Sequence, residues 1–102
     1  MPKRGEVWLV DLGMAQKTRP AVILNVPFGD TDRVVVTVVG HTTALRGSPF
    51  EINVPVPFLR EGAFAAQSIT TIPGKHALRR LGSLTPEQIA LIEQGVRLWL
   101  GL

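Results

Sequence analysis

Short apolar segments, separated by turn-forming residues, make up most of this chain. Segments of this kind, rich in Val, Ile, Thr and Trp and bounded by Gly, Pro and Asp, are typical of β-strands. We therefore expect strands over residues 6–11, 19–25, 33–39, 50–54 and 67–72. Because these strands are short and their connections brief, they favour a compact antiparallel barrel over a β-sandwich.

The last segment has helical periodicity. Thr85-Pro86-Glu87-Gln88 places a threonine N-cap, a proline at the first helical position and a glutamine two residues later, which together form a capping box. Apolar residues then recur at helical spacing over residues 89–100, and three leucines widen the apolar stripe: Leu91, Leu98 and Leu102. The wide stripe fits either a dimer interface or a helix packed over the barrel. We expect one mainly β domain, residues 1–102, with a C-terminal helix.

Composition excludes several kinds of site. A chain of 102 residues can bury enough core to fold without disulfides or bound metal ions, and this chain has no cysteine and only two histidines. Disulfides, thiolate catalysis and zinc–cysteine sites are therefore excluded, and we expect neither a metal nor a cofactor. Uninterrupted apolar runs fall far short of the ~20 residues that span a bilayer. Since Glu6 and Asp11 also interrupt any signal-like start, we expect a cytoplasmic protein without a membrane partner.

Positive charge is concentrated in the body of the chain. Eleven basic residues against eight acidic ones give a formal net charge of +3, and all the basic residues except Arg97 precede the C-terminal segment. A basic body is expected in a protein that meets a polyanion such as RNA. The same excess is also common in proteins that bind no nucleic acid, so charge alone does not decide the function.

One arginine is set at a rigid position. Lys17-Thr18-Arg19-Pro20 precedes an apolar run, and proline, which fixes φ and lacks an N–H, belongs at the first residue or the edge of a strand. Arg19 is thus held where a loop meets a sheet. Its guanidinium can donate two parallel hydrogen bonds to a phosphate. Taken alone, the segment fits a solvated loop arginine at least as well.

If the polyanion is RNA, two catalytic solutions are open. Metal-independent cleavage requires activation of the ribose 2′-hydroxyl, stabilisation of the developing charge and protonation of the 5′-oxygen. A pair of histidines is one solution, for which His41 and His76 are the only candidates. An arginine with hydroxyl partners is the other, and Arg19 with Thr42 or Thr43 fits it.

Residues 4–12, 17–24 and 42–51 resemble the MazF/PemK toxin family of toxin–antitoxin systems. The Gly-Glu-Val-Trp opening and the Arg-Pro strand are the most specific parts, and the similarity runs nearly end to end. The resemblance implies an SH3-like small antiparallel barrel, a homodimer and a small antitoxin partner. It also implies a sequence-specific, metal-independent endoribonuclease that cleaves single-stranded RNA to 2′,3′-cyclic phosphate and 5′-hydroxyl ends.

The resemblance also assigns roles to individual residues. Arg19 and Thr42 fall on the catalytic positions, where Arg19 stabilises the pentavalent phosphate and Thr42 donates to a non-bridging oxygen. Asp11 orients Arg19, accepts from a base or simply forms a turn, and either Gln67 or Ser68 occupies the family's glutamine position. Further RNA-binding candidates flank these positions: Lys17, Thr18, His41, Thr43 and Arg46.

The chain departs from the family pattern at three places. The loop over residues 12–16 is short and has no carboxylate, so the general base is unassigned. Thr70 stands where some members have an arginine, and His41, beside Thr42, is a candidate acid or base. Two other functions remain open: a non-catalytic toxin of the same fold that poisons DNA gyrase through C-terminal residues including Trp99, and a barrel that binds RNA without cleaving it.

Overall fold

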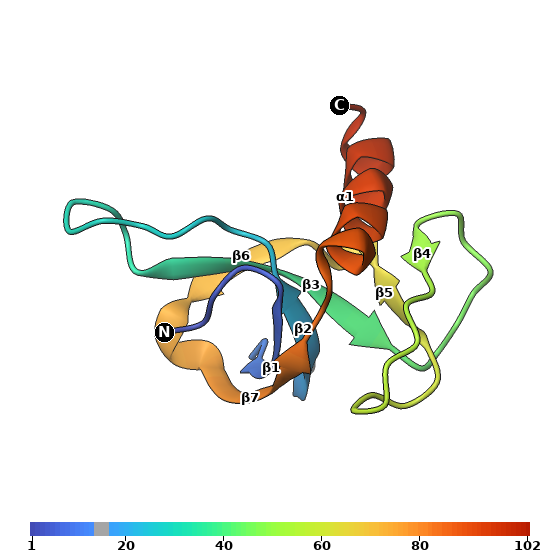
Figure 1. The fold of residues 1–102 in the computed structure, drawn as a ribbon, viewed down its shortest axis with the longest axis horizontal. Coiled ribbons are helices and arrows are strands. Elements are labelled where there is room, and N and C mark those ends of the chain that lie inside the picture. Colours follow the sequence, from blue (N-terminus) through green and yellow to red (C-terminus); the bar gives the residue numbers. More distant parts are fainter. Residues whose placement is uncertain (14–16) are drawn as a thin grey trace.

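A computed structural model describes residues 1–13 and 17–102 as a set of antiparallel strands followed by one long helix (Figure 1). The strands are β1 (Glu6–Asp11), β2 (Thr18–Ile23), β3 (Val35–Thr42), β4 (Glu51–Ile52), β5 (Ala63–Ala65), β6 (Thr70–Pro73) and β7 (Ala77–Ser83). The helix is α1 (Pro86–Leu100), and two short 3-10 helices, η2 (Ala66–Ser68) and η3 (Gly74–His76), lie before β6 and β7.

Strands β7, β1, β2, β3 and β6 wrap into a small barrel. They are paired in that order, each pair is antiparallel, and η3 carries the chain from β6 back to β7. Alternate residues of these strands fill the interior, as the period of two requires: Val10, Ala21, Ile23, Val36, Val38 and Ile72. The predicted mainly β fold, a small antiparallel barrel with a C-terminal helix, is confirmed.

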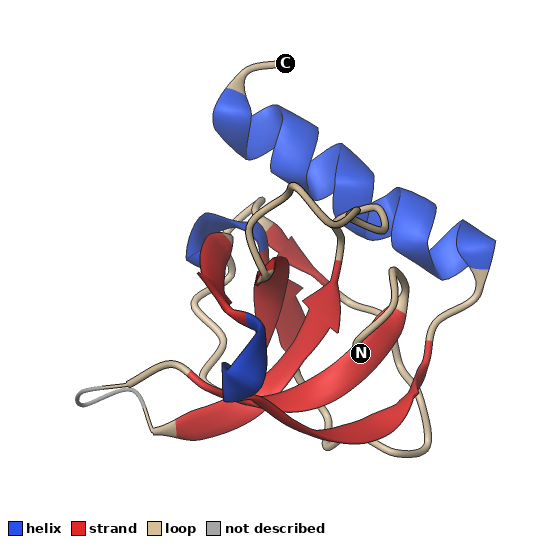
Figure 2. Ribbon diagram, turned by 90° about the vertical axis from the view of Figure 1, so that its left-hand side faces the viewer, coloured by secondary structure: helices blue, strands red, loops and turns tan. Residues whose placement is uncertain are grey.

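The other face of these strands lies beneath the helix, as Figure 2 shows. Val7, Val22 and Val39 alternate with the barrel residues and form a second apolar cluster with Phe64 of β5 and Ile92 of α1. The helix therefore packs on the outside of the barrel, where it covers residues that would otherwise be exposed apolar surface.

A second apolar face of α1 is not covered by the chain itself. The exposed fraction is 47% for Leu91 and 60% for Leu98. Trp99, seven residues after the buried Ile92, lies on the core-facing side of the helix and packs edge-to-face on Phe50, with the ring centroids 5.2 Å apart. The wide stripe seen in the sequence thus serves both faces, of which only one belongs to the core.

The end of β3 departs from the sequence prediction. The pattern places residues 40–49 in a loop, whereas the strand continues to Thr42. Gly40 pairs with Ala21 of β2, and His41 pairs with Phe64 of the short strand β5. These long-range pairs satisfy backbone groups that a local pattern assigns to a loop.

Other boundaries also differ. The strand predicted over 50–54 is reduced to Glu51–Ile52, and of the segment 67–72 only the part from Thr70 is a strand, because Ala66–Ser68 form η2. β5 and β7 are not predicted. β5 has three residues, and β7 is mostly exposed, so neither leaves a clear apolar alternation in the sequence.

The capping box predicted for the helix is present. Thr85 Oγ1 accepts from Gln88 N at 3.2 Å, and Gln88 Oε1 accepts from Thr85 N at 2.8 Å. We expect Thr85→Ala to lower the free energy of unfolding by about 1 kcal/mol, since the N–H of Gln88 loses the hydroxyl that accepts its hydrogen bond. For a domain of this size that loss lowers the melting temperature by about 4–8 °C in thermal unfolding. Thr85→Ser, which keeps the hydroxyl, is the control, and equal stability of both variants would contradict the role of the cap.

Candidate functional site

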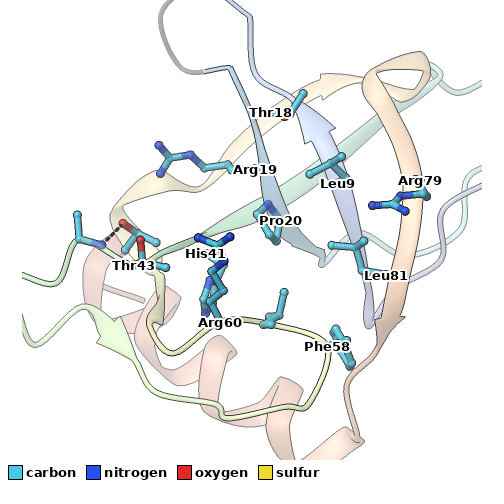
Figure 3. A pocket seen from close by; sticks show the side chains of 13 residues that line it. Leu9, Thr18, Arg19, Pro20, His41, Thr43, Phe58, Arg60, Arg79 and Leu81 are labelled. Atoms are coloured by element: carbon cyan, nitrogen blue, oxygen red, sulfur yellow. Dashed lines mark hydrogen bonds between the residues drawn. The ribbon is translucent and has the colours of Figure 1, made fainter.

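A cleft of about 590 Å³ opens where the ends of several strands meet (Figure 3). Its lining comes from β1, β2, β3, β7 and two loops: Leu9, Thr18, Arg19, Pro20, His41, Thr42, Thr43, Ala44, Phe58, Leu59, Arg60, Arg79 and Leu81. Three arginines and no carboxylate are among these lining residues. A concave surface lined by one sign of charge attracts ligands of the opposite sign, so the cleft favours an anion.

Arg19 is the second residue of strand β2, and its side chain enters the cleft. Its side chain passes Gly40: a Cβ built on Gly40 would lie 3.5 Å from Arg19 Cδ and 3.2 Å from Ser68 Oγ. Arg19 Nε is buried and has no hydrogen-bond partner among the residues that the structure describes. An unpaired buried donor lowers stability by about 1–3 kcal/mol, a loss that an anionic ligand can offset.

Thr42 lies at the matching end of β3. The β2–β3 register sets Ala21 opposite Gly40, where this pairing ends. Arg19 and Thr42 each lie two residues beyond that pair on their own strands, and both line the cleft. Thr42 Oγ1 accepts a hydrogen bond from Ala44 N at 3.1 Å, drawn as the dashed line in Figure 3. Because one lone pair of the hydroxyl is occupied by this bond, its O–H remains available to donate to a ligand.

His41 forms part of the floor of the cleft. Its exposed fraction is 6%, and its ring packs edge-to-face on Phe64 with the centroids 5.1 Å apart. Burial lowers the pKa of His41 from its ordinary value of 6.5. The imidazole is therefore neutral at neutral pH, which is the form that a general base requires.

The structure separates the two histidines. Gly74 N donates to Val34 O at 3.1 Å, so η3, which contains His76, lies beside the start of β3. His41 is near the other end of that strand. At about 3.3 Å per residue the two ends are roughly 20 Å apart. A catalytic histidine pair within one chain is thus wrong, and the alternative with Arg19 and hydroxyl partners remains.

The other predicted residues lie in different surroundings. Asp11 Oδ1 accepts from Gly13 N at 2.8 Å, so this carboxylate forms the turn after β1. Ser68 Oγ accepts from Gly40 N at 2.8 Å and donates to Ala65 O at 2.7 Å, next to the stem of Arg19. Three further candidates are exposed and outside the cleft lining: Lys17, Arg46 and Gln67. Thr18 and Thr43 line the cleft.

The predicted loop over residues 12–16, which lacks a carboxylate, is described by the structure at residues 12 and 13. Leu12 and Gly13 follow β1 directly, while residues 14–16 lie outside the described residues. Because the sequence of residues 12–16 contains no carboxylate, this loop supplies no carboxylate general base.

Among the lining residues that sequence reasoning missed are Phe58, Arg60 and Arg79. Arg79 lies on β7, a strand without a clear pattern, and pairs across from Leu9. Phe58 belongs to the loop between β4 and β5 and packs so tightly on β7 that a Cβ on Gly82 would lie 2.5 Å from its ring. The excess of positive charge in the body of the chain was the only signal for these arginines.

The family of the chain follows from comparison with family models. The model of the PemK-like, MazF-like toxins of type II toxin–antitoxin systems matches residues 3–100. The chain belongs to this family. The matched range of the toxin contains every residue that lines the cleft.

Solved structures agree with this assignment. The toxin is similar to an endoribonuclease solved in complex with its cognate antitoxin from a mycobacterial species, with 26% identity, a TM-score of 0.84, and coverage of 100% of this chain and 97% of that chain. It is similar to the Mycobacterium tuberculosis toxin MazF-mt6 at 25% identity, with a TM-score of 0.80 and coverage of 95% and 97%. A MazE–MazF complex from Deinococcus radiodurans, at 18% identity, TM-score 0.81 and coverage of 99% and 96%, shares the fold.

Two kinds of feature are absent from residues 1–13 and 17–102 of the toxin. No helix in this part of the chain combines the length and the apolar character that crossing a membrane requires. Nor do three or more His, Cys, Asp or Glu side chains gather there in a way that could hold a metal ion.

The burial of His41 predicts a pH-dependent stability. Because the pKa of His41 is lower in the folded than in the unfolded chain, the unfolded chain binds the proton more readily. We expect the free energy of unfolding to fall as the pH is lowered through about 6.5, and to level off below the folded-state pKa. Urea unfolding between pH 8 and pH 5 measures this dependence. His41→Gln, which does not titrate, should lose this component, and an unchanged slope in that variant would contradict the assignment.

Proposed function

We propose that this toxin is a sequence-specific endoribonuclease that cleaves single-stranded RNA by transesterification, without a metal or another cofactor. The observation that carries the proposal is that Arg19 and Thr42 line one cleft whose lining residues include three arginines and no carboxylate, and that the buried Nε of Arg19 has no partner among the described residues. A phosphodiester supplies the anion that this site lacks. Family membership and the similarity to a mycobacterial endoribonuclease at 26% identity support the same reaction.

In the proposed reaction the ribose 2′-oxygen attacks the adjacent phosphorus and the bond to the 5′-oxygen breaks. The products are a 2′,3′-cyclic phosphate and a 5′-hydroxyl, since the proton lost by the 2′-hydroxyl is matched by one gained at the 5′-oxygen. Negative charge grows on the phosphate in the pentavalent transition state. Arg19 donates hydrogen bonds to this charge, and the O–H of Thr42 donates to a non-bridging oxygen.

The proton transfers need a group other than Arg19. A guanidinium stays protonated at any ordinary pH, so Arg19 is a reluctant acid and stabilises charge instead. His41 lines the same cleft, and its lowered pKa keeps the imidazole neutral. Our hypothesis is that His41 accepts the proton of the 2′-hydroxyl.

Further RNA contacts are proposed around this centre. Thr18 and Thr43 line the cleft and offer hydroxyl groups. Lys17 and Arg46 are exposed and can meet flanking phosphates, which makes binding salt-dependent. Gln67, Ser68 and Asp11 stay candidates, and the contact of Ser68 with the Gly40 backbone next to Arg19 favours Ser68 over Gln67 at the family's glutamine position.

We also propose a small antitoxin as a partner. Similar proteins have been solved as complexes with an antitoxin, one from a mycobacterial species and one from Deinococcus radiodurans. A segment of the antitoxin that occupies the arginine-lined cleft would exclude RNA. The free toxin would meet its RNA substrate in the cytoplasm, which is the location we propose.

We expect the toxin to be a homodimer, because the exposed apolar face of α1 lies next to β4, the last strand of its sheet. Light scattering at micromolar concentration should give twice the chain mass. Leu98→Lys should weaken the dimer at least about tenfold, since it buries a charge at an apolar contact. Val26→Lys, at a side chain that is 68% exposed and belongs neither to α1 nor to β4, should leave the mass unchanged. A monomeric wild type would contradict the dimer.

RNA cleavage in excess EDTA tests the function directly. The wild type should cut a long natural RNA at a short common motif, identified by mapping the ends. Arg19→Ala should lower kcat/KM by about 10²–10³-fold, because one charge-stabilising group is lost from the transition state. Arg19→Lys, which keeps the charge but not the two parallel donors, should recover only part of the activity. A susceptible RNA also tests His41→Ala, and full cleavage by this variant would remove His41 from the mechanism.

Other outcomes separate the alternatives. Salt-sensitive RNA binding without cleavage would indicate a barrel that only binds RNA. Gyrase inhibition that Arg19→Ala retains, without RNA cleavage by the wild type, would indicate a gyrase poison acting through the surface around Trp99. Arg19→Ala should keep the circular dichroism spectrum of the wild type and be at least as stable, since it removes a buried unpaired donor, so that a loss of cleavage reports on chemistry.

A further inference from the structure

One carboxylate holds the loop between β3 and β4. The two oxygens of Glu51 accept from Arg46 N at 3.0 and 3.2 Å, from Gly47 N at 2.9 Å and from Ser48 N at 3.1 Å. Three successive N–H groups that converge on one anion form the kind of backbone nest that binds phosphate in other proteins. Gly47 has φ +74°, a conformation that glycine adopts without strain. Here the chain fills the nest with its own side chain.

Hydrogen bonds between residues two or three positions apart hold the rest of the loop. Ala44 N donates to Thr42 Oγ1 at 3.1 Å, and Phe50 N donates to Ser48 Oγ at 3.1 Å. Glu51 N also donates to Ser48 O at 3.1 Å. The backbone from Thr42 to Glu51 is therefore held at both ends and at its tip, while the side chains of the tip point outward and are exposed.

The loop connects Glu51 to the cleft. Thr43 and Ala44 line the cleft, and Glu51 does not. Glu51 can therefore act on the cleft only through the backbone of residues 43–48. Since that backbone donates to Thr42 Oγ1 at Ala44, the same connection influences the hydroxyl that we assign to the phosphate.

We propose that Glu51 is a positioning residue for RNA: its carboxylate fixes the loop so that Thr42 and Thr43 face the scissile phosphate and Arg46 faces a flanking one. This inference rests on the proposed ribonuclease function. The three N–H groups also satisfy the carboxylate, so its charge is partly neutralised where a free carboxylate would repel RNA.

The sign of the effect distinguishes positioning from simple electrostatics. Removing a negative charge near an RNA site should strengthen RNA binding if charge were all that mattered. The proposal predicts the opposite. Glu51→Ala should lower kcat/KM at least about tenfold, because misplaced loop residues stabilise the transition state less well. Glu51→Gln keeps one acceptor oxygen and should lie between the wild type and Glu51→Ala.

Glu61→Gln is the matched control. Glu61 is an exposed carboxylate on the neighbouring loop, outside the cleft lining. Its neutralisation removes the same charge from the same side of the molecule without touching the nest, so its kcat/KM should be unchanged or higher.

Amide hydrogen exchange supplies a readout that needs no cleavage. The amides of Arg46, Gly47 and Ser48 should exchange at least about tenfold faster in Glu51→Ala and stay as in the wild type in Glu61→Gln. The fraction of folded protein in each variant is measured by circular dichroism, and both kcat/KM and the exchange rates are expressed per folded molecule. Faster exchange together with lower kcat/KM supports the proposal.

Three results would overturn it. Unchanged exchange shows that the carboxylate does not hold the loop. Faster exchange with unchanged kcat/KM shows that the loop is held without positioning RNA. A wild type that does not cleave RNA removes the proposed function itself, an outcome distinct from the first two because the exchange result does not depend on it.

Discussion

Burial of β3 on both of its faces is the constraint on which the rest of the structure depends. Val36 and Val38 point into the barrel, whereas Val39 points into the cluster beneath α1. A strand buried on both sides must pair along its length, because unpaired backbone groups in a core are unfavourable. β3 accordingly pairs with β2, β5 and β6. Its C-terminal end is thereby fixed relative to three other strands, and His41 and Thr42 lie there.

The cleft follows from where these strands end. Barrel interiors are filled by apolar side chains, so polar groups collect at the rims, where a strand end supplies both a rigid backbone and access to solvent. Pro20 precedes the buried residues 21–23 of β2, and Arg19 lies before it at the rim. A Cβ on Gly40 would lie only 3.2 Å from Ser68 Oγ, so the glycine leaves room for Ser68 beside the stem of Arg19. Among the residues that the structure describes, Nε of Arg19 has no hydrogen-bond partner.

Arg19 and Glu51, two groups of opposite charge near this rim, differ in how far their hydrogen-bonding capacity is satisfied. Nε of Arg19 has no partner within residues 1–13 and 17–102, which leaves hydrogen-bonding capacity for a ligand. Glu51 is surrounded by backbone donors and has its capacity satisfied within the chain. A site for an anion needs unsatisfied donors in the cleft and satisfied acceptors near it, and the loop from Thr43 to Phe50 separates the two groups.

Local patterns in the sequence determined β1, the capped helix and the strand mouth that holds Arg19, because alternation, capping chemistry and proline act over a few residues. The family resemblance, which is confirmed, came from the same short segments. Only the tertiary structure decided that His41 and His76 lie at opposite ends of β3, that Gly40 to Thr42 extend the strand, and that Arg60 and Arg79 reach the cleft. These facts depend on which strand ends meet across the barrel, and pairing between residues distant in sequence leaves no local signal.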